Sequence, residues 1–126
     1  VEIATLAKKI TNTEILFDEN KVKVVFDNQN FALYFSRSPI PYLRGKEKSS
    51  WINYETHFLH VGMYAFRKNT LMKITKLEQT KLEKFESLEQ LRWVENNFKI
   101  KVLITEYDSF GIDTPEDLEK LNNFLI

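Results

Sequence analysis

Asp113 is a carboxylate placed after an apolar segment, where the chain is expected to leave a strand and enter a helix. In α/β folds, ligands gather beyond the carboxyl ends of the strands. A carboxylate at such a place can hold Mg²⁺ against phosphate oxygens. Because Mg²⁺ usually takes one or two protein carboxylates, one further acid would be needed. The residues alone leave open the alternative that Asp113 only decorates a turn.

Two arginines, Arg37 and Arg44, flank Pro39 and Pro41 in a predicted loop over Ser36–Ser50. The prolines restrict the backbone and so stiffen the loop. Two guanidinium groups beside a stiff loop can bind a substrate carboxylate in fork geometry. A pair of ordinary surface arginines is the alternative.

His60 and Tyr64 lie four residues apart, with Gly62 midway between them. On a strand, these positions share one face, so both side chains would point the same way. The glycine would let a ligand approach the backbone between them. The pattern therefore predicts a polar binding face, with a buried histidine packed beside a tyrosine as the alternative.

Glu89 and Gln90 fall in a long helix predicted over Glu83–Asn97. Phe85 and Trp93 stand one turn before and after Glu89 in such a helix. A carboxylate between two aromatic rings is partly dehydrated, which strengthens its hydrogen bonds to sugar hydroxyls. Gln90 adds a neutral donor and acceptor, and a solvated helix face is the alternative.

The composition restricts the classes of function. The 126 residues are one domain or a piece of one, and 18 basic residues balance 18 acidic residues. A neutral balance argues against a broad surface for nucleic acid or an anionic membrane. The absence of cysteine excludes disulfides and thiolate chemistry, and two histidines are too few for a multi-histidine metal site.

No apolar run in the sequence approaches the ~20 residues that cross a bilayer, and no signal peptide is visible. The lack of cysteine fits a reducing compartment. We therefore expect a cytoplasmic protein with no nucleic-acid partner and no membrane partner.

The elements that must position these residues alternate between strands and helices. Alternating apolar residues and a polar turn at Asp27–Asn30 predict a β-hairpin over Lys21–Ser36. A strand over His60–Phe66 and a short helix over Lys68–Leu77 follow. Val1–Ile10 is compatible with the end of a helix or with an extended segment.

The last part of the sequence predicts another strand and helix. Lys99–Tyr107 contains a nearly continuous apolar stretch, as in a strand covered on both faces. Thr114 is suited to cap the following helix, and Pro115 to its first position. This order of hairpin, strands and helices indicates the α/β fold class.

Four blocks of the sequence stand in register with one known family. The blocks are Phe31-Ala32-Leu33-Tyr34-Phe35-Ser36-Arg37-Ser38-Pro39-Ile40-Pro41, then His60-Val61-Gly62-Met63-Tyr64-Ala65-Phe66-Arg67, then Leu88-Glu89-Gln90-Leu91-Arg92 preceded by Leu82, Glu83 and Glu86, and finally Gly111-Ile112-Asp113-Thr114-Pro115-Glu116-Asp117-Leu118. In this order and spacing, the chain resembles the second half of the 3-deoxy-D-manno-octulosonate cytidylyltransferases, or CMP-Kdo synthetases.

The resemblance implies a fold, a reaction and partners. The fold would be the second half of a nucleotide-diphospho-sugar transferase-like three-layer sandwich, an α/β fold whose mixed sheet carries a β-hairpin used in dimerisation. The reaction would transfer CMP from CTP to Kdo with Mg²⁺, releasing pyrophosphate, in lipopolysaccharide biosynthesis. The family's members are homodimers.

The resemblance also implies roles for individual residues. Asp113 matches the family's catalytic, metal-binding aspartate. Six residues match substrate-binding positions for the sugar: Arg37, Arg44, His60, Tyr64, Glu89 and Gln90. Kdo is an anionic sugar acid, so arginines suit its carboxylate and the other four side chains suit its hydroxyls.

The sequence departs from the family in two respects. Tyr42 and Leu43 stand where many members have Trp and Asp, so the match at Arg44 depends on its spacing from Pro41. The family's triphosphate-gripping segment and its partner metal-binding aspartate have no counterpart here. We therefore interpret residues 1–126 as the C-terminal part of a single cytidylyltransferase domain, inactive alone.

Two other functions remain open from the sequence. One is a related cytidylyltransferase for another sugar acid, such as a sialic acid. The other is a non-catalytic dimerisation or interaction domain, in which the hairpin and helices only pack.

Overall fold

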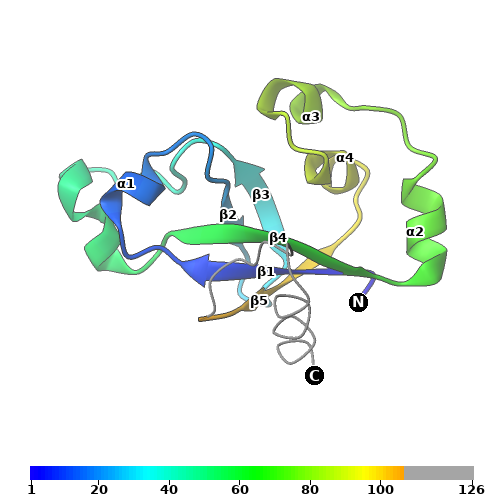
Figure 1. The fold of residues 1–126 in the computed structure, drawn as a ribbon, viewed down its shortest axis with the longest axis horizontal. Coiled ribbons are helices and arrows are strands. Elements are labelled where there is room, and N and C mark those ends of the chain that lie inside the picture. Colours follow the sequence, from blue (N-terminus) through cyan, green and yellow to red (C-terminus); the bar gives the residue numbers. More distant parts are fainter. Residues whose placement is uncertain (107–126) are drawn as a thin grey trace, which may run out of the picture.

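A five-stranded mixed sheet forms the centre of the protein (Figure 1). The computed structural model describes residues 1–106. The sheet has the order β3-β2-β4-β1-β5. Its strands are β1 (Ile3–Lys9), β2 (Lys23–Phe26), β3 (Ala32–Ser36), β4 (Phe58–Phe66) and β5 (Ile100–Ile104). Neighbouring strands are antiparallel except β1 and β5, which are parallel. The expected α/β class and mixed sheet are confirmed.

The first residues of the chain form an interior strand of the sheet. β1 pairs with β4 on one side and with β5 on the other. Ile3, Thr5 and Ala7 are buried and alternate with half-buried residues, as expected for a strand with one face on the core. The extended alternative for Val1–Ile10 is therefore the observed one.

The predicted β-hairpin is confirmed as β2 and β3. Its turn is held by the Asp27 carboxylate, which accepts hydrogen bonds from the backbone N–H groups of Gln29 and Phe31, both at 2.9 Å. Asn30 takes a left-handed backbone conformation (φ 65°), which asparagine tolerates better than most residues.

The helices form two groups, as Figure 1 shows. Near one end of the sheet lie the short α1 (Thr13–Leu16) and a 3₁₀ helix, η1 (Lys48–Tyr54), which begins inside the predicted loop. Toward the other end lie α2 (Lys68–Ile74), α3 (Lys81–Glu86) and α4 (Gln90–Glu95). The predicted strand Lys99–Tyr107 appears as β5, and the helix expected from Thr114 lies outside the described residues.

The prediction of one long helix over Glu83–Asn97 is wrong. Ser87 takes a left-handed conformation (φ 55°) and ends α3, and α4 begins three residues later. The break lets Leu88 enter the core, while Phe85 in α3 is 77% exposed. Glu89 therefore does not lie between two aromatic rings of one helix. The apolar spacing continues across the break, so periodicity could not reveal it.

Strand β4 contains a bulge opposite β1. Thr5 pairs with Tyr64, but the next residue of β1 pairs with Val61, which leaves two residues of β4 without a partner. The Thr5 hydroxyl donates to the Met63 carbonyl oxygen at 2.7 Å, and its oxygen lies 2.8 Å from Nε2 of His60. Since the hydroxyl proton is used on Met63, the neutral imidazole donates from Nε2.

Burial lowers the pKa of His60 from 6.5 to about 4. Between these pH values the unfolded chain binds a proton that the folded protein does not, so stability falls as pH falls from 6.5 to 4. We expect the His60 contribution over this pH range to be about 3 kcal/mol. Urea unfolding of the complete gene product across this range checks it. The variant His60→Gln should show a shallower pH dependence, and an unchanged slope would contradict the prediction.

Candidate functional site

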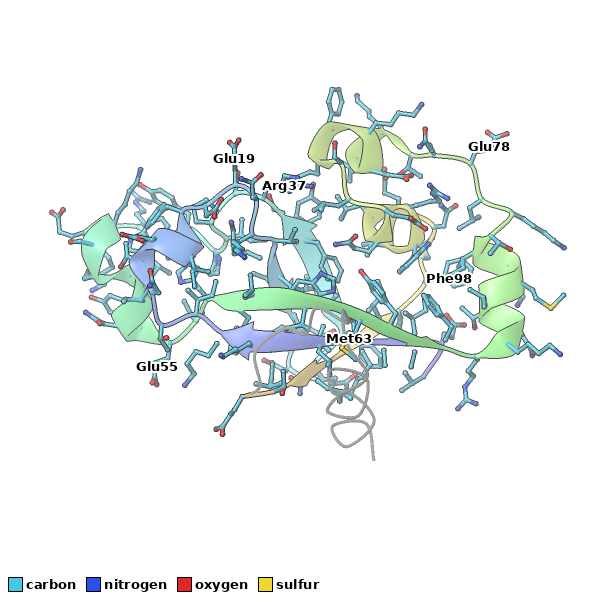
Figure 2. All side chains as sticks on the ribbon, in the orientation of Figure 1. Glu19, Arg37, Glu55, Met63, Glu78 and Phe98 are labelled. Carbon is cyan, nitrogen blue, oxygen red and sulfur yellow. The ribbon has the colours of Figure 1, made fainter. Side chains whose placement is uncertain are left out.

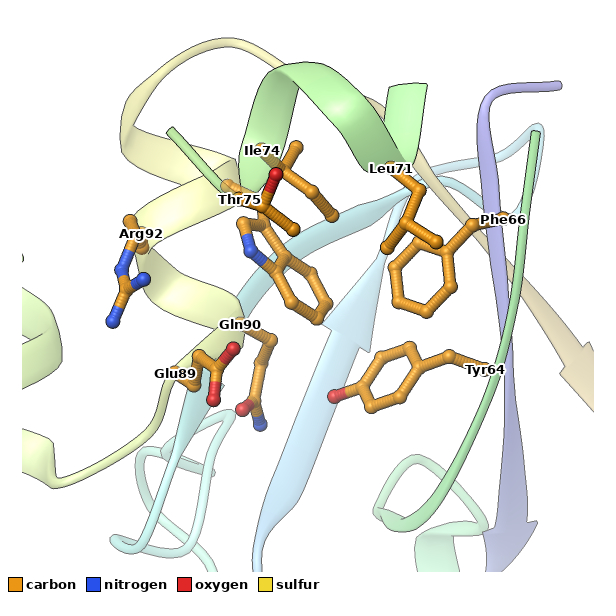
Figure 3. Close-up of a pocket in the computed structure, with 9 residues that line it drawn as sticks. Tyr64, Phe66, Leu71, Ile74, Thr75, Glu89, Gln90 and Arg92 are labelled. Carbon is orange, nitrogen blue, oxygen red and sulfur yellow. The ribbon is translucent and has the colours of Figure 1, made fainter. Parts of the chain in front are cut away.

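A cavity of about 350 Å³ lies between β4, α2 and the start of α4 (Figure 3). Three of the predicted substrate-binding residues, Tyr64, Glu89 and Gln90, line it together. Its complete lining is Tyr64, Phe66, Leu71, Ile74, Thr75, Glu89, Gln90, Arg92 and Trp93. Residues far apart in sequence thus meet in one cavity, as a ligand site requires.

Tyr64 and Gln90 form the polar wall of the cavity. Figure 3 shows the Tyr64 hydroxyl directed from β4 toward the Gln90 side chain. Burial, and after it the negative charge of Glu89, raises the pKa of Tyr64 well above its usual value of 10.0. Tyr64 therefore stays protonated at neutral pH and can donate a hydrogen bond. Gln90 is only 7% exposed, which fixes its amide beside this hydroxyl.

Glu89 contributes a carboxylate at the start of α4. Its backbone is helical, and its side chain makes no hydrogen bond that caps the helix. Glu89 is exposed to solvent at the rim of the cavity. An ionised carboxylate there accepts hydrogen bonds, so it suits a ligand that offers hydroxyl groups.

His60 lies next to the cavity rather than in its lining. Its ring centroid is 5.5 Å from that of Tyr64 and 4.8 Å from that of Phe35. With its Nε2 proton donated to Thr5, the neutral ring presents Nδ1 as an acceptor. The structure thus brings His60 and Tyr64 side by side, as their strand spacing predicted.

Aromatic rings form the apolar wall of the cavity. Trp93 meets Tyr64 and Phe66 edge to face, with centroid distances of 5.1 and 5.4 Å. Flat aromatic faces suit the C–H surfaces of a sugar. The sequence analysis assigned no site role to Trp93, Phe66, Leu71, Ile74 or Thr75, because their spacing resembles that of ordinary core residues.

Arg92 is the basic residue in the cavity lining, and its charge is compensated. Its Nε donates to Glu83 Oε1 at 2.8 Å, and its Nη2 donates to Oε2. Glu83 is 6% exposed, and the hydrogen bonds from Arg92 lower the pKa of its carboxyl group. The ion pair therefore joins α3 to α4 and leaves the cavity suited to hydroxyls rather than to a carboxylate.

The two predicted arginines lie outside this lining. Arg37 follows β3 and donates from its guanidinium group to three backbone carbonyl oxygens, of Glu19, Glu86 and Ser87. Arg44 is exposed on the loop after Pro41. The cavity lining thus contains three of the four residues predicted for sugar hydroxyls, all but His60, and neither of the arginines predicted for a carboxylate.

Asp113 falls outside the described residues, so its predicted metal role stays a prediction. Within residues 1–106, no three or more His, Asp or Glu side chains gather where they could hold a metal ion. In the same part of the chain, no helix is both long and apolar enough to cross a membrane.

Comparisons with known proteins agree with the geometry. A family model described as cytidylyltransferase matches residues 1–101. A 3-deoxy-manno-octulosonate cytidylyltransferase of Parabacteroides distasonis is 52% identical over 98% of this chain and 51% of its own length. One from Thermodesulfovibrio yellowstonii is 52% identical over 93% of this chain and 46% of its own length.

A solved structure gives the same result. It is a CMP:2-keto-3-deoxy-manno-octonic acid synthetase complexed with CTP, which is 35% identical with a TM-score of 0.77. The match covers 99% of this chain and 49% of that one. The chain thus spans about half the length of the relatives it matches. Since the family model covers most of its residues, this chain belongs to the cytidylyltransferase family.

Proposed function

We propose that this chain forms the acceptor-sugar side of an enzyme that transfers CMP from CTP to Kdo, for lipopolysaccharide biosynthesis. The observation that carries the proposal is the shared cavity of Tyr64, Glu89 and Gln90. The names of the relatives support the same reaction. In it, a sugar hydroxyl attacks the α-phosphorus of CTP and pyrophosphate leaves.

The chain's own residues bind and orient the sugar. The Tyr64 hydroxyl and the Gln90 amide donate to sugar oxygens, while Glu89 accepts from sugar hydroxyls. The ring of Trp93 supports the apolar side of the sugar. Holding the attacking hydroxyl in one orientation lowers the entropic part of the barrier, so the contribution of this half is mainly positioning.

The sugar carboxylate points out of the cavity in this proposal. Arg92 is already paired with Glu83, and Glu89 at the rim repels an anion. The carboxylate therefore lies toward a cation outside the cavity lining. Arg44, which is exposed on the proline loop, is the residue that we assign to it.

Mg²⁺ would offset negative charge on the phosphates when bound. Among residues 1–106, no three metal-ligating side chains gather where they could hold it. We propose Asp113 as one of its ligands.

The complete gene product supplied with CTP, Kdo and Mg²⁺ should release pyrophosphate and form CMP-Kdo. A preference for a nine-carbon sialic acid would replace the proposed substrate. Release of no pyrophosphate with either sugar acid would favour a non-catalytic interaction domain.

Tyr64→Phe and Gln90→Ala should each raise KM for Kdo about tenfold, because each removes a hydrogen bond to the sugar. KM for CTP should stay unchanged. Steady-state kinetics with each substrate varied in turn checks this. Tyr54→Phe, at an exposed tyrosine of η1, is the matched control. A wild-type KM for Kdo in both variants would show that the cavity does not bind the sugar.

Asp113→Ala in the complete gene product should lower kcat by about 100-fold or more, since a metal ligand would be lost. The Mg²⁺ concentration that gives half the maximal rate should rise. The circular dichroism spectrum should be unchanged. A variant with the wild-type rate and Mg²⁺ dependence would show that Asp113 is no ligand.

We also propose that the β2–β3 hairpin contributes to a homodimer. β3 is one of the two edge strands of the described sheet, and Leu33 on it is 58% exposed. An exposed apolar edge strand favours association. Light scattering should give the mass of two copies, and Leu33→Glu should shift it toward one. Met72→Glu, at an exposed residue of α2, should not. A wild-type monomer would end this proposal.

A further inference from the structure

Arg37 uses three of its five side-chain N–H groups and does not line the cavity. Its Nε donates to the carbonyl oxygen of Glu86 at 2.7 Å, and its Nη2 donates to that of Ser87 at 3.1 Å. Its Nη1 donates to the carbonyl oxygen of Glu19 at 3.2 Å. Figure 2 shows Arg37 and Glu19 close together near the end of β3. The guanidinium group is therefore held at three points, and one N–H on each of its two Nη atoms lies outside these bonds.

Two of these three carbonyl groups belong to the end of α3. The last carbonyls of a helix have no partner within the helix, and a basic side chain can supply one. Arg37 therefore caps the C-terminus of α3 from the sheet. The positive charge also lies at the end of the helix where the backbone dipoles favour it.

The Glu86 side chain accepts two hydrogen bonds, one from Tyr34 in β3 and one from Arg37, the residue that follows β3. Its Oε1 accepts from the backbone N–H of Arg37 at 3.0 Å, and its Oε2 lies 3.2 Å from the Tyr34 hydroxyl, which donates to it. Glu86 is half-buried and is not part of the cavity lining. Glu86 and Arg37 thus form a reciprocal latch between the sheet and α3.

The latch sits just before the cavity residues. Ser87 is left-handed, and the N–H of Leu88 closes the turn on the Glu83 carbonyl at 3.2 Å. Glu89 and Gln90 come next in the chain. Because the Glu83–Arg92 pair also joins α3 to α4, the latch fixes both helices relative to Tyr64 on β4.

We propose that Glu86, together with Arg37, is a positioning residue for the sugar-binding cavity. The inference rests on the proposed function for its ligand, but the latch itself does not. The two residues hold the start of α4 so that Glu89 and Gln90 face Tyr64. The competing explanation is that Arg37 acts by binding the sugar carboxylate directly, in which case Glu86 has no part in sugar affinity.

The test is a double-mutant cycle in the complete gene product, with Glu86→Ala, Arg37→Ala and the double variant. We expect Glu86→Ala to raise KM for Kdo about tenfold while KM for CTP stays within twofold of wild type. The double variant should be no worse than Arg37→Ala alone, because both changes break the same link. Glu78→Ala, at an exposed glutamate before α3, is the matched control.

Hydrogen exchange gives a readout independent of turnover. Glu86→Ala should speed amide exchange at residues 88–91 and leave β1 and β5 unchanged. If the wild-type protein forms no CMP-Kdo, the proposed function fails, and the latch is then judged by exchange alone. Unchanged exchange would overturn the latch, and so would a wild-type KM for Kdo in an active Glu86→Ala enzyme. A rise in KM for both substrates with faster exchange throughout would also overturn it, since that is general unfolding.

Discussion

The end of helix α3 is the constraint on which the cavity depends. If the chain continued as one helix, Phe85 and Glu89 would stand one turn apart on the same face. The left-handed Ser87 instead separates the two helices, and hydrogen bonds from Arg37 satisfy the carbonyl groups that the break leaves open. The chain can then turn Leu88 into the core and direct Gln90 at Tyr64.

Charge compensation explains why the cavity is suited to hydroxyl groups. Arg92 is paired with Glu83, Tyr64 keeps its proton, and His60, which lies next to the cavity, is neutral because burial lowers its pKa to about 4. Neutral donors and acceptors therefore dominate the wall, with Glu89 at the rim. Such a set discriminates by hydrogen-bond geometry, since a ligand lacking a hydroxyl leaves a buried polar group unpaired.

Local patterns were enough to predict the hairpin, β4 and α2, because turn chemistry and short-range periodicity define them. They also predicted that His60 and Tyr64 share one face of a strand and that Glu89 and Gln90 contribute to a binding site. The break at Ser87 was missed because the apolar period continues through it. The partners of Arg37 could not be foreseen either, because they are carbonyl groups up to 50 residues away in sequence.

The charges around Glu86 explain why a carboxylate is suited to this place. Lys23 is fully buried, and its Nζ donates to the carbonyl oxygens of Asp18 and Lys21. Burial is the main cause that lowers the pKa of Lys23, and Arg37 lowers it further, while the charges of Asp18 and, after it, Glu86 act in the opposite direction. A neutral side chain at position 86 would leave Lys23 and Arg37 with less compensating charge. The Glu86 carboxylate thus offsets positive charge at two places, the buried Lys23 of β2 and Arg37, which caps α3.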